Sequence, residues 1–376
     1  MKRADNDGRH RRRTSGRAAR SLLAAIAIVA LMTACGDDDS GATDQNGEAG
    51  TQAVTLMLPF SESVSFFSPL LADELGYFEE EGLAVEVSPS DGGSVALQQV
   101  VSGNQDLALV SPALILTAVA EGNAVVVPYT DKHRNLFSVV VPVDSEIASP
   151  EDLEGRVLGI TDFGGGELPL ARAMLARAGL EEDVDVELLV VGEGGPAVAA
   201  AFEDGTIDAY AASWSDFFPL VVGGLELEEI LQPELSELPS EVLVATPDYV
   251  GEHADVIEGV SRAMAKASYF TTHDNDAALN LLRERVPQEH EDSEAARAAL
   301  DLWLGIADVP EVDGEARYGA HDPDTWETLK EVLSETAEVD DVEISAILDD
   351  GFIDAANDFD RAEVEAHADE LNLSYP

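Results

Sequence analysis

Strand-like and helix-like stretches alternate from Val54 to about residue 245, and this alternation restricts the possible fold more than any other feature. Short apolar runs such as VTLML and DLALV indicate buried strands, and each precedes a stretch with the apolar spacing of a helix. A strand, a turn containing Gly or Ser, a helix and a further strand are typical of βαβ units. The sequence therefore predicts an α/β fold built on parallel sheets.

The alternation is interrupted once and later resumed. A long strand, NLFSVVVPVDS, ends the first series, a second series starts at RVLGIT, and SEVLVATPDYV is a return strand. We expect two crossings near residues 142–149 and 238–246. They would separate a discontinuous lobe one (53–143 and 245–376, with a helical C-terminal segment) from lobe two (144–244). Two lobes joined by two crossings form a hinge and a cleft, which is a natural ligand site.

The chain is strongly acidic, with 75 Asp and Glu against 21 Lys and Arg and a formal net charge of −54. Such a balance excludes nucleic-acid binding, which requires basic patches that displace counterions. The acidity could form a patch for cationic partners or a solvated acidic shell of the halophile kind. Because the acidic residues are spread along the chain, the shell is the favoured interpretation.

The N-terminus has the pattern of a bacterial export signal. A basic stretch precedes the apolar run LLAAIAIVALM, which is too short to span a bilayer but fits a signal-peptide core. LMTAC resembles a lipobox with Met32 in place of the commoner leucine. We expect residues 1–34 to be a lipoprotein signal peptide, Cys35 the lipid attachment point and 35–52 a flexible acidic tether. The alternative is an ordinary secretory signal with an incidental cysteine.

Cys35 is the only cysteine of the chain. A single cysteine excludes disulfides within the chain and zinc sites built from several cysteines. The sequence also contains no His-Glu-x-x-His, P-loop or nucleophile-elbow motif, and its seven histidines are scattered. We therefore expect no catalytic residues, no metal and no cofactor.

Several phrases along the chain together resemble one protein group. They are ADELGYFEEEGLAVEV, GGSVALQQVVSGNQDLALVSPALILTAVAEG, VVVPVDSEIASPEDLEGRVLGI, AFEDGTIDAYAASWSDFFPL and the late DPDTWETLKEVL. The group is the ABC-transporter substrate-binding proteins related to binders of thiamine-pyrimidine precursors, nitrate, sulfonates and taurine. The GYFxxEGL and SPEDLxG phrases are the more specific ones. The resemblance covers roughly residues 54–353.

The resemblance implies the type 2 periplasmic-binding-protein fold and capture of a small molecule outside the cytoplasm. A protein of this group delivers its ligand to an ABC permease with its ATPase. Together with the lipobox, it implies a monomer anchored to the outer face of the cytoplasmic membrane through Cys35.

The resemblance places ligand contacts on strand-to-helix turns, where backbone N–H groups and hydroxyls face the cleft. These turns follow the strands of both lobes. The candidate ligand-binding residues are Ser61, Phe66, Phe67, Gly92, Gly93, Ser94, Ser111 and Ala113 in lobe one, and Thr161, Gly164, Gly165, Gly166, Glu167, Trp214 and Asp216 in lobe two.

Several candidates have a structural alternative. The glycines of SDGGS are also typical of a tight turn, Ser94 or Ser111 of a helix cap, and Phe66 and Phe67 of a core face. For FGGGE we expect half of a clamp, in which the glycines let the backbone approach a small flat ligand and Glu167 accepts hydrogen bonds from an amino group. The alternative is that Glu167 only complements the helix dipole. Trp214 and the phenylalanines could stack on an aromatic ring.

The ligand class is predicted from the charges of these loops. None contains Lys or Arg, which disfavours nitrate, sulfonate or taurine, because such anions need a cation or many donors. Lys132, His133 and Arg134, beside the predicted hinge, are the exception. The sequence favours an amino-substituted heterocycle such as a thiamine-precursor pyrimidine. A sulfonate, taurine or nitrate binder, a pyrimidine-synthase-like enzyme and a ligand sensor of the same fold remain alternatives.

Overall fold

The computed structural model describes residues 51–376, except 233–234 and 313. The predicted signal peptide, Cys35 and nearly all of the predicted tether therefore lie outside the described residues. Within the described part, no helix combines the length and the apolar character needed to cross a bilayer.

The first of two five-stranded sheets has the order β2-β1-β3-β10-β4. Its strands β1 and β2 and its strands β1 and β3 are parallel, whereas β10 is antiparallel to both β3 and β4. The strands are β1 (Gln52–Leu58), β2 (Leu83–Pro89), β3 (Leu107–Val110), β4 (Val126–Lys132) and β10 (Glu241–Ala245).

The second sheet has the order β7-β6-β8-β5-β9, which repeats the plan of the first. Strand β6 is parallel to β7 and β8, and β5 is antiparallel to β8 and β9. In each sheet the antiparallel inner strand is the one that follows a crossing of the chain into that sheet. The strands are β5 (Phe137–Pro142), β6 (Val157–Ile160), β7 (Glu187–Val190), β8 (Ala209–Ser213) and β9 (Leu227–Glu229).

The crossings lie at residues 133–136 and 230–240, earlier than the sequence indicates. Strand β5 belongs to the second sheet, although residues up to 143 were assigned to lobe one, and β10 is already back in the first sheet. The reason is local. Only residues 133–136 separate β4 from β5, so in the sequence the two strands read as neighbours of one series although they belong to different sheets.

Helices follow the strands as the sequence predicts, with one break. The predicted helix over residues 63–78 is divided at Gly76, whose φ of 73° lies in the left-handed region. The helices and 3₁₀ turns of this part are η1 (Val64–Phe66), α1 (Phe67–Glu74), α2 (Tyr77–Glu80), α3 (Gly93–Val101), α4 (Pro112–Ala120), η2 (Pro150–Leu153), α5 (Leu168–Arg177), α6 (Pro196–Glu203) and α7 (Trp214–Val222).

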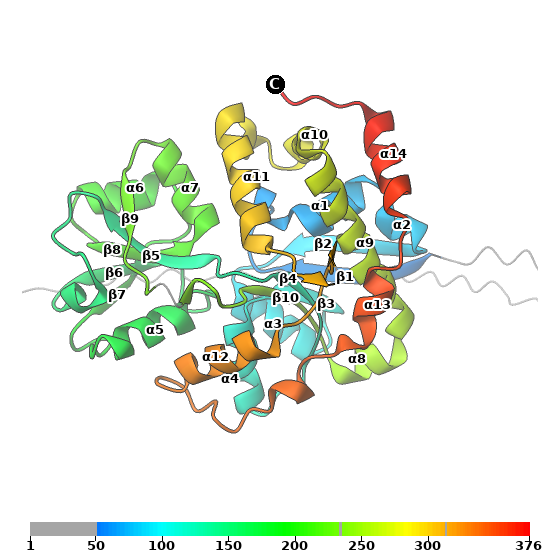
Figure 1. The fold of residues 1–376 in the computed structure, drawn as a ribbon. Helices are drawn as coiled ribbons and strands as arrows, with labels where there is room; N and C mark the ends of the chain where they lie inside the picture. Colours follow the sequence, from blue (N-terminus) through cyan, green and yellow to red (C-terminus); the bar gives the residue numbers. More distant parts are fainter. Residues whose placement is uncertain (1–50, 233–234, 313) are drawn as a thin grey trace, which may run out of the picture. The chain divides into compact units, whose positions relative to one another are not determined.

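The C-terminal segment is mostly helical, as expected, with one small hairpin (Figure 1). DPDTWETLKEVL forms α12, as its resemblance implies. The elements are α8 (Pro247–Glu252), α9 (Ala254–His273), α10 (Asn275–Arg285), η4 (Pro287–His290), α11 (Ser293–Ala307), β11 (Glu311–Val312), β12 (Glu315–Ala316), α12 (Pro323–Leu333), η5 (Ile344–Ala346), η6 (Asp350–Phe352), α13 (Ile353–Ala356) and α14 (Arg361–Leu371).

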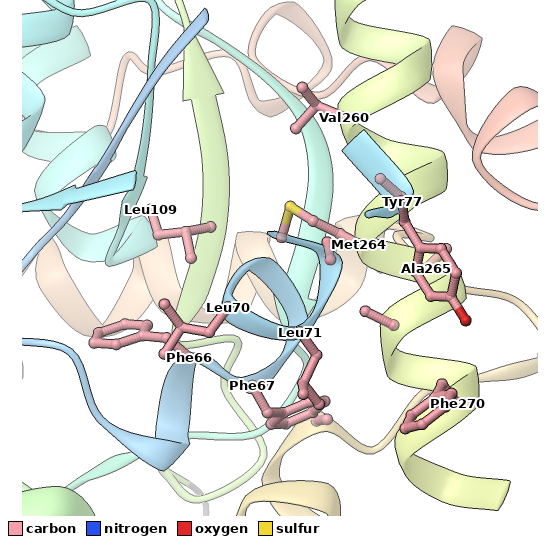
Figure 2. Packing of buried hydrophobic residues seen from close by; sticks show 14 of the residues in the cluster. Phe66, Phe67, Leu70, Leu71, Tyr77, Leu109, Val260, Met264, Ala265 and Phe270 are labelled. Atoms are coloured by element: carbon pink, nitrogen blue, oxygen red, sulfur yellow. The ribbon is translucent and has the colours of Figure 1, made fainter. Parts of the chain in front are cut away.

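Buried apolar clusters attach these helices to the sheets. In the first cluster α1 packs against α9, whose stripe of Val256, Val260, Met264 and Ala267 is fully buried (Figure 2). A second cluster contains residues of both sheets, and in it α12 contacts α4 and α5. Helix α12 therefore joins the elements that follow the first sheet to those that follow the second. This arrangement leaves the carboxyl ends of the parallel strands free for a site.

Candidate functional site

A cavity of about 340 Å³ lies between the strand-to-helix turns of the two sheets. The turns after β1, β2 and β3 line it from one side, the turns after β6, β7 and β8 from the other, and both crossings close it. The lining residues are Pro59, Phe60, Asp91, Gly92, Gly93, Ser111, Leu136, Phe137, Thr161, Asp162, Gly165, Gly166, Glu167, Gly192, Glu193, Ser213, Asp216, Ser240 and Glu241.

The three glycines of FGGGE have side-chain atoms close to the position that a Cβ would occupy. A Cβ on Gly165 would collide with the carboxylate of Glu167, and one on Gly166 would lie 2.6 Å from Cζ of Phe137. At Gly164 it would lie 3.0 Å from Oδ1 of Asp162. The loop therefore folds tightly over its own acidic side chains, and a side chain at any of the three positions would force a shift.

The same loop contacts the turn after β2. The backbone N–H of Ser94, at the N-terminus of α3, donates to the carbonyl of Gly164 over 3.1 Å. Gly92, with φ of 116°, leaves room for the Asp162 carboxylate, which would lie 3.4 Å from an added Cβ. A carbonyl and a carboxylate from one side thus face a helix N-terminus on the other, which carries a partial positive charge.

Glu167 lies immediately before α5 and is only 4% exposed. Its Oε1 accepts hydrogen bonds from the backbone N–H of Thr161 (3.2 Å) and from the Thr161 hydroxyl. Burial raises the pKa of Glu167 to about 7, and the two bonds from Thr161 only partly offset this effect. Glu167 caps no N–H of its helix through its side chain, so capping does not explain its position.

Asp216 has a structural task at the start of α7. It forms a capping box with Ser213, accepting the Ser213 hydroxyl at 2.6 Å, and it also accepts the N–H of Gly194 at 2.8 Å. Burial nevertheless raises the pKa of Asp216 above its usual range. The Asp216 carboxylate therefore lines the cavity while it already accepts hydrogen bonds from Ser213 and Gly194.

The cavity is not lined by Phe66 or Phe67, which the sequence predicts as ligand-binding residues. Phe66 and Phe67 are buried among the residues of the first core cluster (Figure 2). Their core alternative therefore holds. The aromatic side chains of the cavity are Phe60, which packs on Phe66 with ring centroids 4.8 Å apart, and Phe137.

The other candidates divide into two groups. Gly92, Gly93, Ser111, Thr161, Gly165, Gly166, Glu167 and Asp216 line the cavity. Ser61, Ser94, Ala113, Gly164 and Trp214 do not, although Ser94 and Gly164 join the two sides. Trp214 packs edge-on against Phe217, with ring centroids 5.5 Å apart, and it is not among the residues that line the cavity.

The basic residues Lys132, His133 and Arg134, at the start of the first crossing, do not line the cavity. Lys132 is completely buried and pairs with Asp131, His133 contacts the carbonyls of Ala307 and Ala320, and Arg134 pairs with Glu237 and Asp308. All three are thus occupied by other residues of the chain. Among the described residues that line the cavity, none is Lys, Arg or His.

Sequence reasoning missed several lining residues, above all Phe60, Phe137, Glu193 and Glu241. Phe60 and Glu193 each follow a strand at its carboxyl end, and attention to every such turn would have found them. Phe137 and Glu241 lie where the crossings meet their strands, so they required the position of the hinge. The described residues contain no group of three or more His, Cys, Asp or Glu arranged to hold a metal ion.

The comparisons with known proteins agree with this architecture. A formylaminopyrimidine-binding protein from Halalkalibacterium halodurans is 24% identical over 340 residues, which cover 88% of this chain and 96% of that protein. A solved structure from Bordetella bronchiseptica RB50 has a TM-score of 0.68 at 21% identity and covers 81% of this chain and 96% of that one.

The alkanesulfonate-binding protein SsuA from Xanthomonas axonopodis pv. citri, bound to MOPS, has a TM-score of 0.59 at 16% identity. The match covers 79% of this chain and 97% of that one. These likenesses confirm the expected α/β periplasmic-binding-protein fold. The profile described as NMT1/THI5 like matches residues 64–278, more than half of the chain. The chain therefore belongs to the NMT1/THI5-like family.

Proposed function

We propose that this protein captures a small organic ligand between its two sheets and delivers it to an ABC importer, a permease with its ATPase. The observation that carries the proposal is the cavity of about 340 Å³ lined by strand-to-helix turns of both sheets. Cavities of this size suit small molecules, and a lining drawn from two lobes allows closure around the ligand. Here lobe two comprises the second sheet with its helices, and lobe one the rest of the described chain.

The ligand we propose is an amino-substituted heterocycle such as a thiamine-precursor pyrimidine. Phe60 and Phe137 offer aromatic faces for a flat ring, and Glu167 offers a buried carboxylate to an amino group. The relative from Halalkalibacterium halodurans, whose name states that it binds formylaminopyrimidine, supports this choice.

A sulfonate is the second candidate, because a structural neighbour is an alkanesulfonate-binding protein bound to MOPS. The charges of this cavity oppose it. Its ionisable lining residues are all acidic, and Lys132 and Arg134 do not line it. Lys132 is buried between Asp131 and Glu241, and Arg134 pairs with Glu237 and Asp308. Sulfonate, taurine and nitrate would each meet carboxylates without a compensating cation.

The proposal also includes anchoring on the outer face of the cytoplasmic membrane through lipid on Cys35, a monomeric state and the absence of enzymatic activity. Relatives named as binding proteins support a non-enzyme. A ligand sensor of the same fold would bind the same ligand but would not require a permease. Transport assays in cells that lack the chain would separate these two functions.

The test is calorimetric titration of the purified protein with formylaminopyrimidine, taurine and nitrate in parallel. We expect heat of binding with the pyrimidine alone and no chemical change in the recovered ligand. Binding of taurine or nitrate without binding of the pyrimidine would contradict the proposed ligand. Turnover of the pyrimidine would contradict the proposed class.

A further inference from the structure

Three buried charged residues meet where the two crossings join the first sheet. Lys132 ends β4 and Glu241 begins β10, and the two are paired across these neighbouring strands. Lys132 is 0% exposed, and its ammonium pairs with Asp131 and lies 3.5 Å from Oε1 of Glu241. The ring of Phe67 lies 4.7 Å from the same ammonium. These groups enclose Lys132 completely.

The two carboxylates of this cluster, Asp131 and Glu241, differ in their hydrogen-bond partners. The Asp131 carboxylate has both the Lys132 ammonium and the Ser68 hydroxyl, which donates over 2.6 Å. Glu241 is 4% exposed, and within the described chain its Oε1 has no hydrogen-bond partner. One ammonium thus faces two carboxylates, and Glu241, whose Oε1 lies near the ammonium without a hydrogen bond, is the one that lines the cavity.

The other charged groups around the cavity have the same sign. They come from the turns of both sheets and are Asp91, Asp162, Glu167, Glu193 and Asp216. A solvated acidic shell does not explain the two most buried members, Glu167 and Glu241, because each is only 4% exposed. A buried carboxylate is costly unless it is protonated or paired with a positive charge.

We propose that the cavity selects a ligand bearing a positively charged nitrogen, for which Glu241 is the anchor and Lys132 the positioning residue. The inference deepens the proposed function and rests on it, since it assigns a charge to the captured small molecule. An organic cation fits better than a metal ion, because the cavity holds about 340 Å³ and no described group of three ligands converges in a metal site.

Two pairs of near-isosteric probes test the charge directly in the wild-type protein. The first pair is 4-amino-5-aminomethyl-2-methylpyrimidine, a cation at neutral pH, and its neutral 5-hydroxymethyl counterpart. The second pair is choline and neutral 3,3-dimethylbutan-1-ol, which contain no pyrimidine. In calorimetric titration we expect the cation of a pair to bind at least about tenfold more tightly than its neutral counterpart, the effect of one charge-assisted contact.

The outcomes separate this inference from the proposed ligand. Preference for choline over its neutral counterpart, with no binding of either pyrimidine, would retain the charge inference and reject the pyrimidine. The inference would be overturned if, in every pair that binds, the neutral compound bound as tightly as the cation or more tightly. It would also be overturned if neither cation bound.

The variant Glu241→Gln tests the anchor. It leaves Asp131 paired with Lys132, so the buried cluster keeps a balanced ion pair, and the preference for the cation should fall about tenfold or more. The matched control is Glu146→Gln, which removes one exposed negative charge outside the cavity. Loss of preference in both variants would assign the effect to net charge and would overturn the role of Glu241.

Discussion

Among single residues, Glu167 is a predicted ligand contact that lines the cavity as a buried carboxyl group. The glycines beside it make room for its carboxylate and for Phe137, and Thr161 holds Oε1 in place. The variant Glu167→Gln keeps an acceptor oxygen and the shape but removes the charge. If Glu167 binds an amino group, affinity for formylaminopyrimidine should fall roughly 10- to 150-fold, as expected for loss of a contact worth about 1.5–3 kcal/mol.

Calorimetry of the ligand together with a melt of the free protein measures this effect. A carboxylate that served only the helix dipole would instead cost up to about 1 kcal/mol of stability and leave affinity unchanged. Unchanged affinity with a lowered Tm would thus assign the loop's contribution to its glycine backbone.

The buried carboxyl of Glu167 also predicts how stability depends on pH. Its folded-state pKa is raised from 4.5 to about 7, mainly by burial, so between these values the folded chain holds a proton that the unfolded chain has lost. The free energy of unfolding should therefore fall as the pH rises from about 4.5 to 7, by about 3 kcal/mol from this group. Urea unfolding at pH 5 and 7.5 measures the change.

Glu167→Gln should reduce this loss of stability with rising pH. Part of it should remain, because burial also raises the pKa of Asp216, Glu193 and Glu241. An identical dependence in the wild type and the variant would contradict the elevated pKa of Glu167.

At the scale of elements, the turn between β6 and α5 determines how closely the two sides of the cavity approach. An added Cβ at Gly166 would lie 2.6 Å from Phe137 and 3.2 Å from Cβ of Ser111, which follows β3 in the other sheet. Gly166→Ala should therefore push the loop outward, lower stability by about 1–3 kcal/mol and weaken binding of formylaminopyrimidine. Thermal melts and calorimetry report the two effects.

Gly305→Ala in α11 is the matched control. No atom lies within 4 Å of its added Cβ, and alanine favours a helix over glycine, so the change should be neutral or stabilising by up to about 1 kcal/mol. Equal destabilisation by both substitutions would contradict the packing argument at Gly166.

Local patterns predicted the elements better than they predicted the hinge. The strand-to-helix turns follow from short-range apolar spacing and α12 from the family resemblance, whereas the expected approach of the FGGGE backbone to a ligand stays a prediction. The crossing at 133–136 did not follow from such spacing, because a polar stretch between two strands is equally expected within one sheet, and only long-range pairing assigns β5 to the second sheet. Phe66 and Phe67 were misplaced for a related reason: a helix start near a cleft offers a core face and a cleft face, and periodicity alone does not identify which is which.

The same limit applies to Lys132. In the sequence it is a cation beside a hinge, which could have served an anionic ligand. The structure buries it between Asp131 and Glu241, a partner 109 positions farther along the chain that only the pairing of β4 with β10 brings close.

At the scale of the whole molecule, the basic N-terminus and Cys35 predict where the protein is held. Cys35→Ser should abolish incorporation of radiolabelled lipid, and the chain should be released or retain its signal peptide, because the thiol is the proposed attachment point. Labelling followed by fractionation of membranes measures both effects. Labelled lipid that persists in the variant would contradict anchoring at Cys35.

The net charge of −54 predicts a dependence of stability on salt. Some acidic residues have local structural roles, since Asp274, Asp292, Asp322 and Asp360 accept backbone N–H bonds at the starts of α10, α11, α12 and α14. The 75 acidic residues nevertheless far outnumber the 21 basic ones, and folding concentrates this charge. Self-repulsion should therefore destabilise the folded state at low ionic strength.

Salt should relieve this repulsion, because the Debye length shortens from about 30 Å at 0.01 M to about 3 Å at 1 M. Tm should rise between these concentrations, by roughly 2–4 °C for each kcal/mol of relief. Thermal melts in NaCl and in KCl measure the rise, and screening predicts similar values in both salts, whereas binding of a particular cation would favour one. A Tm that stays flat or falls would mean that the acidic side chains are already far enough apart for water alone to screen them.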